Sequence, residues 1–262
     1  MSPLLPVALS ALYGFMAWRM LRQPAASHPD WLRFLLPGVL LAHGWALAES
    51  LFGAGDIRMG LGNSLSTIAW LTALIYWLVS HGAPLLRIQA WVNVLAAGAL
   101  LLMAVFSATH TIPNSNQLAL RVHLAVAFLA YGLLAVAALH AGLMTVLEKR
   151  LHQGRAMEGG TPPLLTLEAV LFKTIAAGFV LLTLTVVSGI LFSEVLFGQP
   201  LQFTHKVIFA ILSWAVFGGL LLGRHFRGWR GRTALIWTMT GFILLVLAYI
   251  GTQFVLEVLL RR

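Results

Sequence analysis

The sequence predicts an all-α fold, a polytopic membrane bundle of eight transmembrane helices. The chain has 17 Lys and Arg and 8 Asp and Glu, so only 25 of its 262 residues are charged. A helix needs about 20 residues to cross a hydrocarbon layer of roughly 30 Å. Most of the charge-free runs approach or exceed that length: 1–18, 34–48, 59–86, 88–120, 122–147, 174–193, 207–223 and 233–256. These runs are continuously apolar and do not alternate with period two, which favours helices over a β-barrel.

We expect each run to form one helix, with these approximate bounds: 3–20, 31–52, 61–80, 85–106, 119–147, 170–193, 203–223 and 233–258. The connection 81–84 is so short that the third and fourth helices must be antiparallel neighbours. The connection 148–165 mixes charges with Gly and Pro and predicts a surface loop, with 164–172 as an amphipathic lead into the sixth helix. The composition is 60% hydrophobic and 10% charged, so residues 1–262 are expected to form a single membrane domain.

The basic residues predict the orientation of the bundle. The net charge of +9 would suggest nucleic acid in a soluble protein, but here the basic residues lie between hydrophobic runs, where they orient helices, so we expect no nucleic-acid partner. The first run lacks a basic start and is followed by Arg19 and Arg22, the reverse of a cleavable signal peptide. With the N-terminus outside, 12 of the 17 basic residues fall on the inner side and five on the outer side. Both termini are therefore expected on the outer face.

The residue types in the chain exclude some kinds of active site. Without cysteine the chain has no disulfide, thiolate metal site or thiol redox pair. The eight carboxylates all map to helix ends or loops, which argues against a carboxylate-coupled antiporter and leaves a histidine relay open. We find no nucleophile elbow and no acid near a buried histidine, so a hydrolase triad is not predicted.

Histidine is the remaining candidate, and the chain has nine. Six of them map to loops, helix ends or the inner half of a helix: His28, His81, His110, His140, His152 and His225. The other three, His43, His123 and His205, map to the outer half of the membrane. An imidazole in lipid is costly unless it faces the bundle and finds a partner, so these three are the site candidates. The alternatives are a plain helix–helix hydrogen bond for His43 and His123, and a solvated side chain for His205.

Two imidazoles on facing helices can supply both axial bonds to a haem iron, and a porphyrin needs the apolar and aromatic walls that this chain has in abundance. The alternative is a divalent metal such as zinc, copper or cobalt, whose sites usually add carboxylate or thiolate ligands. In this chain Glu49, Asp56 and Glu194 could act as such ligands only at the outer edge of the bundle. The composition therefore favours haem.

An ordered set of motifs resembles the YpjD/HemX branch of the cytochrome c assembly superfamily, which includes CcsA and CcmC. The set runs along nearly the whole chain: 41–47 around His43, 62–66 with Trp70, 121–123 with Tyr131, 204–206 with Ser213 and Trp214, 228–232, and 248–251. The resemblance implies an eight-helix bacterial inner-membrane protein of a fold that handles haem b, with outward histidines as axial ligands. It implies an outer ligand at His123, a recurring second-helix histidine at His43, and the usual opening of the seventh helix at His205 and Lys206.

Two features of the haem-attaching members are missing. Their tryptophan-rich segment between the sixth and seventh helices has no counterpart, because residues 193–205 contain no Trp. An outer histidine after the last helix is also absent, since the chain ends at Arg262. Both differences argue against haem lyase activity. Haem binding, haem relay and haem sensing stay possible functions under this resemblance.

The sequence therefore predicts a haem-binding integral membrane protein. His123 and His205 are the expected axial pair, and His43 is a third ligand or a proton partner. Two further hypotheses stay open. One is an efflux protein, or its accessory, for a divalent cation such as cobalt or magnesium. The other is a non-catalytic membrane regulator of haem synthesis that contacts another membrane or haem-pathway protein through 148–165. Membrane lipid and haem are the expected partners of the main hypothesis.

Overall fold

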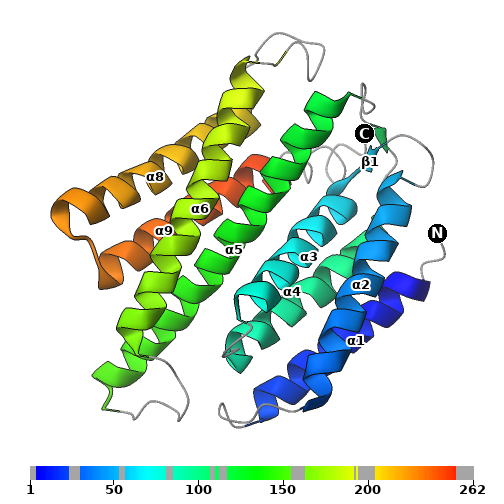
Figure 1. Ribbon diagram of the computed structural model, residues 1–262, viewed down its shortest axis with the longest axis horizontal. Helices are drawn as coiled ribbons and strands as arrows, with labels where there is room; N and C mark the ends of the chain where they lie inside the picture. Colours follow the sequence, from blue (N-terminus) through cyan, green and yellow to red (C-terminus); the bar gives the residue numbers. More distant parts are fainter. Residues whose placement is uncertain are drawn as a thin grey trace. The chain divides into compact units, whose positions relative to one another are not determined.

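The computed structural model describes residues 4–23, 30–52, 57–80, 85–106, 110–111, 117–154, 163–191, 193 and 204–251. In this part of the chain, eight helices are long and apolar enough to cross a membrane, which confirms the predicted fold class. They are α1 (Leu4–Arg22), α2 (Asp30–Phe52), α3 (Leu61–Val79), α4 (Leu86–Val105), α5 (Leu118–His152), α6 (Leu164–Leu191), α8 (His205–Arg227) and α9 (Gly231–Val246), the last extended by the π-turn η1 (Leu247–Gly251) (Figure 1).

Several helix boundaries differ from those predicted, and α8, for example, ends at Arg227 rather than at 223. α5 continues to His152, past the predicted end at 147, because Lys149, Arg150 and His152 in its last turn complement the negative end of the helix dipole. α6 begins at Leu164, so the predicted lead 164–172 is part of the helix itself. α9 gives way to η1 after Val246. The connection 81–84, the middle of the connection 148–165, the link 194–203 and the end of the chain lie outside the described residues.

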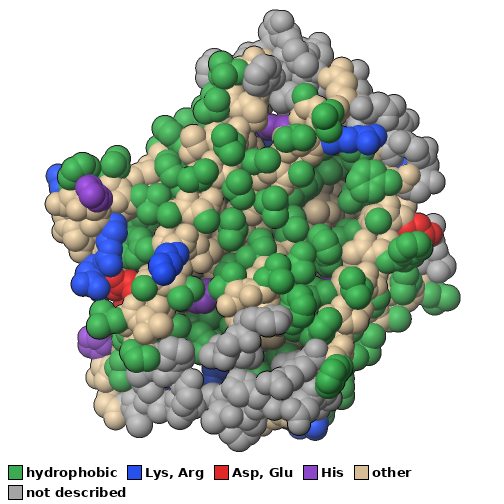
Figure 2. All heavy atoms as spheres, viewed as in Figure 1, with side chains coloured by type: hydrophobic (Ala, Val, Ile, Leu, Met, Phe, Trp, Pro, Cys, Tyr) green, Lys and Arg blue, Asp and Glu red, His purple; other side chains and the backbone are tan. Residues whose placement is uncertain are grey.

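The helices pack as two compact units. Unit 1 contains α1 to α4, and unit 2 contains α5, α6, α8, α9 and η1. The expectation of a single domain over 1–262 stays a prediction. Figure 2 shows hydrophobic side chains over most of the viewed surface, with few charged ones. That surface suits a lipid environment, because lipid tails contact apolar side chains without cost.

Unit 1 is built on α4, which packs against α1 and α3, while α2 packs against α1 and α3. The contact of α3 with α4 agrees with the short connection between them. Gly62 makes that contact close, since a Cβ there would lie 2.7 Å from Met103 Cα and 2.8 Å from the Leu102 carbonyl oxygen. A short antiparallel pair joins the segments next to these helices: β1 (Arg58–Met59) and β2 (His110–Thr111).

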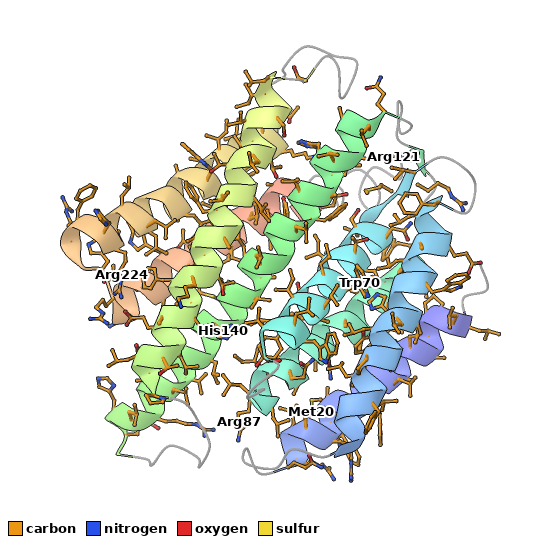
Figure 3. All side chains as sticks on the ribbon, viewed as in Figure 1. Met20, Trp70, Arg87, Arg121, His140 and Arg224 are labelled. Carbon is orange, nitrogen blue, oxygen red and sulfur yellow. The ribbon has the colours of Figure 1, made fainter. Side chains whose placement is uncertain are left out.

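Unit 2 packs α5 against α6 and α9, and α8 against α6, α9 and η1. One end of the unit is held by Glu168, which is buried near the start of α6. Arg224 donates from Nη1 to Glu168 Oε1 over 2.6 Å, and Arg230 donates from Nε to the same oxygen over 2.8 Å. Arg224, labelled in Figure 3, lies in the last turn of α8. The start of α6, the end of α8 and the turn into α9 are therefore joined by one carboxylate.

Candidate functional site

A group of histidine, aromatic and basic side chains lies at the opposite end of unit 2. We call it the His123 cluster and define it as His123, Ser188, Lys206 and Tyr249. It is built by the first turns of α5, the last turns of α6, the first turn of α8, and η1. Figure 3 labels Arg121 at this start of α5, and His140 well along α5 toward the other end of the helix.

His123 is half-buried and hydrogen-bonded to α6. Its Nδ1 lies 2.8 Å from Ser188 Oγ. Ser188 Oγ also lies 3.2 Å from the Thr185 carbonyl, and a hydroxyl that donates to that carbonyl accepts from His123 Nδ1. We assign the Nδ1–H tautomer on this basis, which leaves the basic lone pair on Nε2. The imidazole also lies against α6 at Gly189, where an added Cβ would be in ordinary contact with His123 Cε1 at 3.5 Å.

Aromatic rings from α5 and η1 lie next to the cluster. The ring centre of Tyr249 is 6.4 Å from that of Phe128 and 6.1 Å from that of Tyr131, in both cases edge to face. The Tyr131 hydroxyl donates to the Leu245 carbonyl over 3.1 Å, just before η1 begins. Edge-to-face rings of this kind form a rigid apolar wall.

α8 begins at the cluster with His205 and Lys206, both exposed. Lys206 Nζ lies 5.4 Å from the ring centre of Tyr249, within the range of a cation–π contact. The charge of Lys206 also acts electrostatically on His123. Within the described part of the chain, His205 has no hydrogen-bond partner. His123 and His205 are thus at one end of one unit, and their place on the outer side stays a prediction.

His43 belongs to unit 1 and is completely buried, with 0% exposure. Its Nε2 lies 2.9 Å from Ser66 Oγ, and its Nδ1 lies 3.4 Å from the Tyr13 hydroxyl. The Tyr13 ring also meets the imidazole edge to face at 5.7 Å. Both ring nitrogens are therefore within reach of a hydroxyl, and Tyr13, His43 and Ser66 form a continuous chain of polar groups across α1, α2 and α3.

Trp70 of α3, labelled in Figure 3, holds the turn of α2 that precedes His43. Its Nε1 donates to the Leu40 carbonyl of α2 over 2.8 Å. Gly44 makes room for the indole, since a Cβ there would lie 3.0 Å from the Trp70 ring. This packing fixes α2 against α3 beside His43.

The structure describes four further histidines. His140 is buried and bonds within its own helix, with Nδ1 2.9 Å from the Val136 carbonyl. His152 and His225 are exposed at helix ends, and His110 lies in β2. His28 and His81 lie outside the described residues. Among the residues that the structure describes, no three His, Asp or Glu side chains gather as a metal site, and Asp56 and Glu194 are not among them.

Two side-chain pairings of unit 2 were not predicted from the sequence. Ser188 is the partner of His123, and its only signal is a hydroxyl in the last apolar turns of the sixth helix. Glu168 was placed at a helix end without its arginine partners, which lie 56 and 62 residues further along the chain. Neither pairing is visible before the helices are packed.

Comparison with known proteins gives several matches. The family model described as Cytochrome C assembly protein matches residues 31–260. The inner membrane protein YpjD of Escherichia coli is 32% identical over 139 residues, covering 53% of this chain and 52% of YpjD. The cytochrome c biogenesis protein CcsA of Chlamydomonas reinhardtii is 28% identical over 211 residues, covering 74% of this chain and 57% of CcsA.

A 28.8 kDa protein of Azospirillum brasilense, itself uncharacterized, is 29% identical over 229 residues, covering 82% of this chain and 81% of that protein. The match to YpjD and to CcsA thus spans little more than half the length of either relative. No solved structure matches the chain.

Proposed function

The chain belongs to the cytochrome c assembly protein family and is a multi-pass inner-membrane protein, and from this premise we propose that it binds haem b at the His123 cluster, with His123 and His205 as the axial ligands. Haem would supply a redox-active iron whose two axial positions accept imidazole nitrogens.

The bond from His123 to Ser188 is the observation that carries this proposal. A ligating histidine usually donates its other ring N–H to a nearby oxygen, which orients the ring and raises the basicity of the coordinating nitrogen. The Nδ1–H···Ser188 bond of 2.8 Å has that form and directs coordination to Nε2. His205 complements it, because it is exposed at the same end of unit 2 and has no hydrogen-bond partner within the described residues.

The surrounding side chains fit a porphyrin. Tyr249 packs edge to face against Phe128 and Tyr131 at the same end of unit 2 as His123, and an aromatic macrocycle would pack on rings of this kind. A small polar ligand would gain little from these rings. The chemistry of the donor set, imidazole with aromatic walls, therefore supports haem over a hydrated divalent cation.

For His43 we propose the role of proton partner in place of a third iron ligand. Its two ring nitrogens are already engaged with Ser66 and Tyr13, so coordination would require one of these contacts to break. An imidazole between two hydroxyls can exchange tautomers and so pass a proton along the chain of hydrogen bonds.

Absorption spectroscopy of the full-length protein, purified from haem-replete cells, tests the proposal. We expect a b-type spectrum with the Soret band of a six-coordinate, bis-histidine haem. His123→Ala and His205→Ala should each abolish that ligation, whereas the control His225→Ala, at the far end of α8, should leave it unchanged. A wild-type protein without a b-type spectrum, or a His123→Ala variant with an unaltered one, would contradict the assignment.

A further inference from the structure

Lys206 has no carboxylate partner among the described residues. The acidic side chains that the structure describes are Glu49, Glu148 and Glu168. Glu49 belongs to unit 1, while Glu148 lies at the other end of α5, and Glu168 is held by two arginines at that same far end of unit 2. The ammonium group therefore lies over an aromatic ring, and no described anion balances its charge.

The position of Lys206 raises the positive potential of the cluster. It is the second residue of α8, whose first turn contains no acidic residue. A helix begins with unpaired backbone N–H groups that carry partial positive charge, so a lysine there is unfavourable unless an anion compensates. The helix start and the ammonium group together favour a negatively charged group at this point.

The proposed ligand carries such groups. Haem b has two propionate side chains on an otherwise apolar macrocycle, and its iron would bind beside Lys206 if His205 is a ligand. We propose, resting on the haem site proposed above, that Lys206 binds a carboxylate of the porphyrin and makes the site selective for a porphyrin with free propionates. The Tyr249 ring holds the lysine side chain in position through the contact of 5.4 Å.

The test compares a porphyrin with ionised propionates and the same porphyrin with its propionates methylated. Full-length protein depleted of haem is reconstituted in nanodiscs of zwitterionic phosphatidylcholine and titrated with hemin or with hemin dimethyl ester, whose propionates are neutral. The wild type should bind the diacid about tenfold more tightly than the diester, as expected for one charge-assisted hydrogen bond. Lys206→Gln should bring the two dissociation constants together without changing the affinity for the diester.

Two matched variants separate the local contact from general effects. Lys206→Arg keeps the charge and should keep the preference for the diacid. Lys149→Gln is the same chemical change in the last turn of α5, at the other end of unit 2, and should leave the preference at the wild-type value. Adding anionic phosphatidylglycerol should not alter the preference, whereas its loss there would assign Lys206 to a lipid headgroup.

The outcomes distinguish the two proposals. If either porphyrin gives a bis-histidine spectrum but Lys206→Gln discriminates as the wild type does, the haem site stands and the role of Lys206 is overturned. A wild type that binds both porphyrins equally overturns it as well, without reference to any variant. If neither porphyrin is bound, the proposed function itself fails.

Discussion

At the scale of single residues, His123 and His43 differ in the hydroxyls that surround them. A Ser188 hydroxyl that donates to the Thr185 carbonyl can only accept from His123, which favours one tautomer. His43 meets two hydroxyls, each of which can donate or accept, so neither tautomer is imposed. The two proposed roles, metal coordination for His123 and proton exchange for His43, rest on this difference.

Ser188→Ala should weaken haem binding while leaving the bis-histidine spectrum in place. The variant removes the acceptor that orients His123 and raises the basicity of Nε2, and loss of such an outer contact typically costs about tenfold or more in metal affinity. Spectrophotometric titration with hemin measures the change. Thr174→Ala is the control, because within the described residues this hydroxyl on the same helix bonds to the Val170 carbonyl alone. Equal affinity in wild type and Ser188→Ala would count against the tautomer assignment.

The sequence shows the candidate histidines but not their partners. His123 and His205 are predicted from their places at the outer ends of apolar runs, and the structure brings both to one end of unit 2. Ser188 is 65 residues from His123, so its role depends on how α5 and α6 rotate against each other. That rotation is decided by close packing, for example of Leu134 against Gly178, which hydropathy does not encode.

At the scale of elements, charge marks where a helix leaves the hydrocarbon layer and not where it ends. α5 has 35 residues, so its length is about 52 Å, well beyond a core of roughly 30 Å. Its predicted end at 147 is the point where Glu148, Lys149 and Arg150 begin, and the helix continues through them. The predicted start of α6 is late for the same reason, because Glu168 lies inside that helix.

Gly62→Ala should destabilise the packing of α3 on α4. The added Cβ would lie within 2.8 Å of backbone atoms of Met103, Leu102 and Phe106, and a backbone cannot move aside as a side chain can. Overpacking of this kind costs about 1–3 kcal/mol, which a thermal or denaturant unfolding curve in detergent measures. Gly98→Ala on α4 is the matched control, since a Cβ there meets nothing within 4 Å. A Gly62→Ala protein as stable as Gly98→Ala would show that the two helices are not in close contact.

At the scale of the whole molecule, the number of spans follows from the sequence and the division into units does not. Each apolar run becomes one helix, because a bilayer leaves the backbone no other way to satisfy its hydrogen bonds. Which helices pack together depends on small residues and buried polar pairs, such as Ser10 with the Ala97 carbonyl in unit 1 and Ser213 with the Gly241 carbonyl in unit 2. These contacts are invisible to a scan for hydrophobicity.

The orientation in the membrane stays a prediction, and the cysteine-free chain offers a direct way to measure it. Thr204 precedes α8 on the predicted outer side, and Gln153 follows α5 on the predicted inner side; both are exposed. In intact cells, a membrane-impermeant maleimide should label Thr204→Cys and spare Gln153→Cys, which should react only after lysis. The reason is the excess of basic residues, 12 against 5, that the predicted orientation keeps inside. The reverse labelling would place the His123 cluster on the cytoplasmic side, and any haem bound there would then be exchanged with the cytoplasm.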